Sequence, residues 1–277
     1  VGAGKESILN LAAAASEQDA LYVTVSSEDT PVAAMVRTIT MDGLTSKGSD
    51  YAVPNNVSAK TLAINGLSEG DDVNLYVYPS QQADVTVSWT DGTGTKNTNQ
   101  QTLEANRVSV IDLGSVPKSA TGLTISATEP VTAAAKVTND GDGDQADFAL
   151  VNASVPMNVS AMAVPDHATA QVSVTNTSDD DRTATLTSYN GDGDIVEQSD
   201  LTIRAGASTT IELADINDGD VAAVSLADPD QSMVWNIRVS QKDVSDAKLA
   251  GVSIIGATDL KEAREQVWSN QNMTIVR

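Results

Sequence analysis

Apolar and polar residues alternate along many short stretches of this chain, and the alternation predicts β-strands. In the stretches 85–89 (VTVSW) and 172–174 (VSV) every second residue is apolar. A period of two places one row of side chains on a buried face and the other row in water, as in antiparallel sheets. Asp-Gly and Asn-Gly pairs follow at 91–92 and 190–191 and favour tight hairpin turns. The pattern therefore predicts an all-β fold built from antiparallel β-sandwiches.

The chain also repeats itself. The strand–turn–strand stretch that begins at Val73 matches the one that begins at Val172, and residues 103–113 match 203–213. A looser match joins 122–137 to 221–239. The period of about one hundred residues is too long for a solenoid unit and has the size of a small domain.

The first residues fit the same repeat, but only its second half. Residues 4–11 match 106–113 and 206–213, and residues 20–38 match the segment from Gly122. We therefore expect a first module whose front half is missing and which packs on the next module. The expected units are a partial β module at 1–58 and two immunoglobulin-like or fibronectin-like β-sandwich modules at 59–155 and 156–277, with one short helix near the C-terminus at 259–268.

The opening Gly-Ala-Gly-Lys, residues 2–5, has part of the pattern of a phosphate-binding loop. A working loop needs a preceding strand, a first glycine and a Ser or Thr after the lysine, and here Glu6 takes that last place. The repeat aligns Gly4 with Asn106 and Gly206, residue types that tolerate a positive φ. The stretch is therefore interpreted as a turn that leads into a strand.

Composition excludes several classes of function. The 277 residues carry a formal net charge of −22, which argues against nucleic acid and against an anionic membrane surface as partners. The chain has no cysteine, which excludes disulfides, thiolate metal sites and thiol catalysis. Its longest apolar run, 11–15, is too short to cross a bilayer. We expect no nucleic-acid partner and no direct membrane insertion by these residues.

Three aspartates at every second position form the candidate metal site. Asp140, Asp142 and Asp144 have the spacing that opens a calcium-binding loop, in which oxygens converge on a hard cation. The later positions depart from that pattern, because Gln145 replaces the usual glycine and Val151 the closing glutamate. The alternative is an acidic turn, since Asp and Gly are turn residues in any case. The shorter stretch 190–194 (NGDGD) leaves the same choice open.

Other residues offer little catalytic chemistry. His167 is the only histidine, so a histidine metal site or a triad has no obvious second member. Trp89 and Trp235 lie in alternating stretches and are predicted to pack in cores, and Trp268 lies apart. Carboxylates are plentiful, which leaves glycoside hydrolysis open without singling out a pair. We expect no catalytic and no cofactor-binding residue.

The last repeat resembles a known family. Residues 168–196 read ATAQVSVTNTSDDDRTATLTSYNGDGDIV, followed by LTIRAGASTTIEL at 201–213 and VAAVSLADPDQSMVWNIRVSQ at 221–241. These stretches are similar to an actinobacterial family of exported proteins of unknown function, DUF5719. Through the repeats the resemblance covers most of the chain. It implies an extracellular, cell-surface protein that is anchored by a membrane segment upstream, with a link to envelope glycan assembly. It implies no catalytic residue.

These observations favour a non-catalytic envelope protein, a scaffold or binding module whose partner is a cell-envelope glycan or protein. The first alternative is an accessory or regulator of glycan assembly that binds a polysaccharide or a glycosyltransferase. The second is a glycoside hydrolase. A scaffold should lack a deep acid-lined cleft, a glycan binder should expose aromatic side chains on one face, and a hydrolase needs two facing carboxylates with shifted pKa values.

Overall fold

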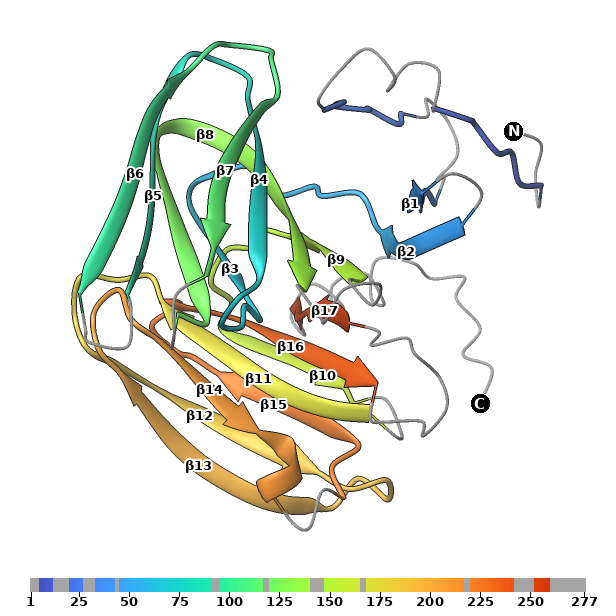
Figure 1. Ribbon diagram of the computed structural model, residues 1–277. Coiled ribbons are helices and arrows are strands. Elements are labelled where there is room, and N and C mark those ends of the chain that lie inside the picture. The colour runs from blue at the N-terminus through green and yellow to red at the C-terminus, as the bar shows by residue number, and fades with distance from the viewer. Residues whose placement is uncertain are drawn as a thin grey trace, which may run out of the picture.

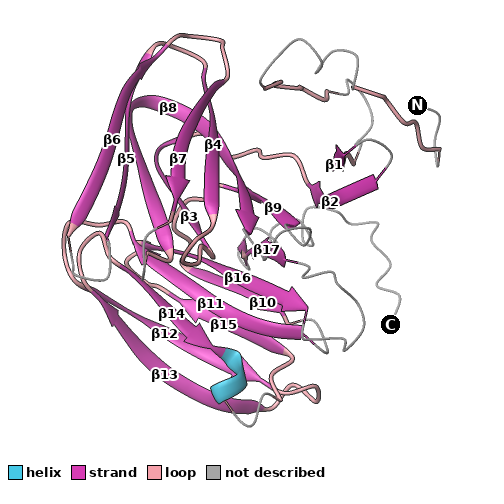
Figure 2. Ribbon diagram, in the orientation of Figure 1, coloured by secondary structure: helices cyan, strands magenta, loops and turns pink. Residues whose placement is uncertain are grey.

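Strands account for most of the protein in the computed structural model, as the alternation of apolar residues predicts (Figures 1 and 2). The structure describes residues 5–11, 20–26, 33–42, 45–90, 95–116, 120–139, 147–164, 168–216, 220–241 and 252–259. Within them the sheet pairings are antiparallel, and one 3-10 turn, η1 (Leu213–Asp215), follows a strand. The prediction of a nearly all-β, antiparallel fold is confirmed.

The middle of the chain forms a first sandwich, the upper body in Figure 1. The long strand β8 belongs to both of its layers: the first half pairs with β3 and β5, and the second half pairs with β4 and β9. Strands β6 and β7 complete the two layers at their edges. The strands are β3 (Ala59–Asn65), β4 (Asp72–Pro79), β5 (Ala83–Thr90), β6 (Lys96–Leu103), β7 (Ser109–Ser115), β8 (Gly122–Asn139) and β9 (Asp147–Asn152).

A second sandwich follows with the same plan. Its sheets have the orders β13-β12-β15-β10-β18 and β14-β11-β16-β17, and β15 and β16 take the places of the two halves of β8. The strands are β10 (Val159–Ala163), β11 (Ala168–Asn176), β12 (Arg182–Tyr189), β13 (Ile195–Ile203), β14 (Ser208–Glu212), β15 (Ala223–Ala227), β16 (Met233–Gln241), β17 (Val252–Gly256) and β18 (Thr258–Asp259). The order of strands in the second sandwich is therefore the same as in the first.

Each sandwich has its own hydrophobic core. Leu75, Val87 and Ile125 lie in the first, and Leu186 and Trp235 lie in the second. Ile254 of β17 is an exception, because this residue from the end of the chain packs into the first core. The two sandwiches thus share a strand at their boundary, and the division at 155/156 stays a prediction.

Parts of the N-terminal region contact the first sandwich. β1 (Val36–Asp42) and β2 (Thr45–Ala52) form a hairpin, and β2 lies beside β9 (Figure 1). Asp50 Oδ2 accepts a hydrogen bond from the Leu150 amide at 2.7 Å, and the rings of Tyr22 and Tyr78 stack with centroids 3.8 Å apart. At the other end, Asp259 closes β18, and residues 260–268 of the predicted helix lie outside the described residues.

Candidate functional site

The predicted calcium residues Asp140, Asp142 and Asp144 lie outside the described residues. The strands on either side are antiparallel neighbours that pair up to Asn139 and Asp147. Calcium binding at these aspartates stays a prediction. In the described part of the chain, no group of three or more His, Asp or Glu side chains could hold a metal ion.

The related stretch 190–194 is described, and it forms a turn. Asn190 Oδ1 accepts hydrogen bonds from the amides of Asp192, at 3.1 Å, and Asp194, at 2.9 Å. Gly193 has φ 85°, a conformation that favours glycine. The asparagine side chain thus closes the β12–β13 hairpin, which is the turn interpretation of this stretch.

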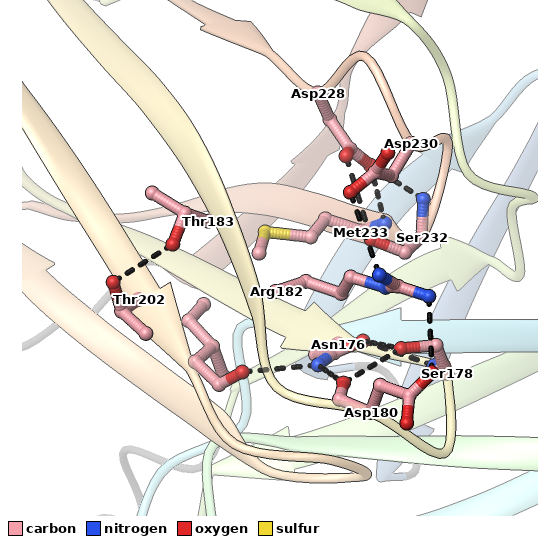
Figure 3. Close-up of polar contacts among 11 residues, drawn as sticks. Asn176, Ser178, Asp180, Arg182, Thr183, Thr202, Asp228, Asp230, Ser232 and Met233 are labelled. Atoms are coloured by element: carbon pink, nitrogen blue, oxygen red, sulfur yellow. Dashed lines mark hydrogen bonds and ion pairs between the residues drawn. The ribbon is translucent and has the colours of Figure 1, made fainter.

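Buried Asn176 organises the acidic turn between β11 and β12 (Figure 3). Its Nδ2 donates to the carbonyl oxygens of Asp180, at 2.8 Å, and Ile203, at 3.0 Å. Its Oδ1 accepts from the amide of Ser178 at 2.9 Å and from the hydroxyl of the same residue at 2.8 Å. Sequence reasoning missed this role, although an asparagine directly before a Thr-Ser-Asp run is a recognisable turn signal.

Arg182 links this turn to the turn between β15 and β16. Its guanidinium lies 3.2 Å from Asp180 Oδ2 and 3.7 Å from Asp230 Oδ2 (Figure 3). The side chain of Arg182 is about one-third exposed, so these ion pairs contribute little to stability individually. They connect the two neighbouring turns at the surface.

Asp228 is the buried carboxylate at the corner between β15 and β16. Its Oδ2 accepts hydrogen bonds from the amides of Ser232 and Met233, each at 2.6 Å (Figure 3). Its own amide donates to the carbonyl oxygen of Asn158 at 2.7 Å. The carboxylate therefore satisfies the backbone at the point where the chain leaves one sheet for the other. This residue was also missed, because Asp-Pro-Asp is read from sequence only as an ordinary turn.

A buried ion pair joins the two sandwiches. Asp71, in the turn before β4, is 1% exposed, and Arg238 of β16 is 7% exposed. Arg238 Nη1 lies 2.5 Å from Asp71 Oδ2, and Nη2 lies 3.1 Å from Asp71 Oδ1. Nη1 also donates to the carbonyl oxygen of Gly66 at 2.9 Å. No feature of the sequence pairs these residues.

The surface has a polar groove beside the turn between β6 and β7. Arg107 and Glu104 form an exposed pair at 3.2 Å there, and Asn106 accepts a hydrogen bond from the Tyr78 hydroxyl at 3.3 Å. Tyr22, which stacks on Tyr78, is 48% exposed. Burial raises the pKa of Tyr76, two residues earlier on β4. The residues that line the groove are Ala20, Gln101, Thr102, Leu103, Glu104, Arg107, Val108, Ser109 and Val110.

A second hollow is small and apolar. Leu67, Val73 and Leu123 line it together with Trp89, whose indole N–H is buried without a hydrogen-bond partner. Trp235 is 1% exposed and donates to Ser160 Oγ at 2.6 Å. The predicted core positions of these two tryptophans are confirmed, since Trp89 packs against the first core and Trp235 lies inside the second. Trp268 and His167 lie outside the described residues.

Among the described residues, no helix has the length and apolarity that a membrane crossing requires.

Comparisons with known proteins give distant similarities. The PBSX exported protein XepA is 11% identical, with 68% of this chain and 88% of that chain covered and a TM-score of 0.23. Oxalate decarboxylase from Bacillus subtilis is 8% identical, with 78% and 75% covered and a TM-score of 0.22. A protein from Parabacteroides distasonis described as secreted is 12% identical, with 81% and 87% covered and a TM-score of 0.18. Structural similarity at this level supports no conclusion about function.

No curated protein matches the chain significantly. A family model does match, over residues 1–214, which is more than half of the sequence. The chain belongs to the family of unknown function DUF5719.

Proposed function

We propose that this protein is a non-catalytic scaffold or binding module on the extracytoplasmic side of a cell envelope. The observation that carries the proposal is how the described chain uses its buried charged side chains. Asp228 bonds backbone amides, and Asp71 and Arg238 bond each other across the two sandwiches. A catalytic site typically places perturbed acids or bases in a cleft. Here the buried charges hold turns and a joint in place.

The hydrolase alternative is less well supported. Hydrolysis of a glycoside by two carboxylates requires them to face each other across the substrate. The carboxylate that lines the polar groove, Glu104, is exposed and paired with the neighbouring Arg107. That arrangement suits hydrogen bonding to a ligand better than proton transfer.

The extracytoplasmic location rests on composition and on the resemblance of the last repeat. The absence of cysteine favours an exported bacterial protein, and the strong acidity favours a soluble surface. Anchoring by a membrane segment upstream is part of the same proposal.

Co-sedimentation with isolated bacterial cell walls and membranes, with calcium and with chelator, tests the proposal. Pelleting with walls or membranes in either condition supports a binding module of the envelope. If the chelator abolishes pelleting, calcium-dependent binding is assigned to Asp140, Asp142 and Asp144. Release of reducing sugar from the walls by the purified chain would overturn the non-catalytic proposal, and pelleting with neither fraction would argue against direct binding to the envelope.

Binding of a polysaccharide is the second candidate function, and the tyrosines beside the polar groove favour it. Aromatic rings and side-chain hydroxyls and amides are the groups that bind sugar rings, and Tyr22, Tyr78 and Asn106 gather them in one place. Affinity electrophoresis in gels that contain cell-wall polysaccharide tests this. The polysaccharide should retard the wild type. Loss of this retardation in Tyr22→Ala, together with normal retardation of Tyr189→Ala in the second sandwich, would support the proposal.

A further inference from the structure

The end of the first sandwich rests on the outer face of β11 and β16. Along β16, Trp235 and Ile237 point into the second core, while Asn236 and Arg238 alternate with them and face the first sandwich. Because Asn236 and Arg238 point away from the second core, their side chains would ordinarily be exposed to solvent. Both residues are instead buried, because the other sandwich covers them.

Asn65, fully buried at the end of β3, connects the two bodies through hydrogen bonds. Its Nδ2 donates to the carbonyl oxygen of Val234 at 2.9 Å, and its amide donates to Asn236 Oδ1 at 3.2 Å. The Thr175 hydroxyl donates to Asn65 Oδ1. At the edge of the contact, the Thr90 hydroxyl donates to the carbonyl oxygen of Gly206 at 3.3 Å. Backbone and side-chain groups of one sandwich thus satisfy those of the other.

Two glycines allow this close approach. Gly66 has φ 83°, and a Cβ added there would lie 2.9 Å from Ile254 Cγ2. A Cβ at Gly122 would overlap Asn65 Oδ1 and Thr175 Oγ1. A larger residue at either position would force these neighbouring side chains to shift.

We infer that the two sandwiches are locked at one angle and move as a single rigid arm, with Asp71 and Arg238 as the lock. A rotation of one sandwich would separate the two charges while both remain buried away from water. Two unpaired buried charges are strongly unfavourable. A buried ion pair adds little net stability compared with apolar residues of the same size, but it penalises every arrangement that leaves it unpaired. The pair therefore selects one docking angle among those that the apolar contacts would allow.

This inference does not depend on the proposed function. Neighbouring domains in one chain are ordinarily expected to move relative to each other. A locked joint keeps any surface of the first sandwich at a constant distance from any surface of the second. Such an arm can hold two partners, or a partner and an anchor, at a fixed spacing.

Distance measurement between two spin labels tests the lock, and the cysteine-free chain makes labelling specific. Ala105→Cys in the β6–β7 turn and Asp192→Cys in the β12–β13 turn place both labels at exposed positions on different sandwiches. Pulsed electron paramagnetic resonance of the full chain should give one narrow distance distribution. A broad distribution for the otherwise wild-type chain would overturn the inference.

Matched substitutions then test the role of the pair. Asp71→Asn should broaden the distribution or add a second distance. Asp72→Asn is the control, because the exposed side chain of Asp72 accepts a hydrogen bond from Ser115 Oγ at 2.9 Å within the first sandwich and should leave the distribution unchanged. If Asp71→Asn does not fold, the double variant Asp71→Leu/Arg238→Met removes both charges together, so that neither is left buried without its partner, and it should show the same broadening. A distribution as narrow as the wild type in the folded variant would show that the ion pair is not the lock.

Discussion

Asp71 and Arg238 are 167 residues apart in the sequence and form a bidentate, buried ion pair in the structure. Asp71 belongs to the turn between β3 and β4 of the first sandwich, and Arg238 belongs to β16 of the second sandwich. Their pairing converts the outer face of β16 into an internal surface. Removal of either partner alone should therefore destabilise the whole chain, because the other charge stays buried.

Arg238→Ala should destabilise the protein by about 3–5 kcal/mol, because the substitution leaves the Asp71 carboxylate buried without its partner. Urea unfolding followed by tryptophan fluorescence measures the change. Arg107→Ala is the matched control, since its pair with Glu104 is exposed and should contribute about 1 kcal/mol or less. Equal effects of the two substitutions would contradict the assignment.

Asp228→Ala should cost about 1–3 kcal/mol or more, because the amides of Ser232 and Met233 lose a buried acceptor. Thermal unfolding monitored by circular dichroism reports the loss. Asp230→Ala, two residues on in the same turn, removes only a partly exposed carboxylate and should be close to neutral. If both variants melt together with the wild type, the carboxylate at residue 228 is not needed at this corner.

Gly122→Ala should destabilise by about 1–3 kcal/mol, because the added methyl group overlaps Asn65 and Thr175 at the joint. Gly191→Ala provides the comparison, since nothing lies within 4 Å of a Cβ there. Chemical denaturation of both variants in parallel tests the difference. A Gly122→Ala protein as stable as Gly191→Ala would mean that the joint has room that the structure does not show.

Tyr76 makes stability fall at alkaline pH. Burial raises the pKa of its hydroxyl above the ordinary 10.0, so the folded state keeps a proton that the unfolded state loses. The contribution is fully present below pH 10.0 and is lost as the pH rises through the higher folded pKa. Tyr76→Phe should therefore reduce the alkaline loss of melting temperature, whereas Tyr51→Phe, at an exposed ring, should not. Parallel curves for all three proteins would refute this.

The candidate metal residues show the limit of spacing as a guide. Asp140, Asp142 and Asp144 and the stretch 190–194 have similar sequences, and the second stretch is a turn closed by Asn190. Alternating Asp and Gly satisfy the needs of a hairpin as well as those of a cation, so spacing alone does not separate the two. Convergence of oxygens on one point is a property of the folded loop.

The sequence by itself determined the alternating strands and the hairpin turn at 190–194. Those features depend on neighbours within a few residues, and the alternation in Val85–Val87 or Val172–Val174 is sufficient to mark a buried and a wet face. Only the tertiary structure decided that part of the outward, polar face of the second sandwich is buried. Asn236 and Arg238 occupy the outward row of β16, and a local pattern assigns that row to solvent. They are covered because the first sandwich, folded from a distant part of the chain, docks there and supplies Asn65 and Asp71 as partners. The physical reason is that burial of a polar face is favourable only when every polar group on it finds a partner, and those partners come from residues that no local pattern connects.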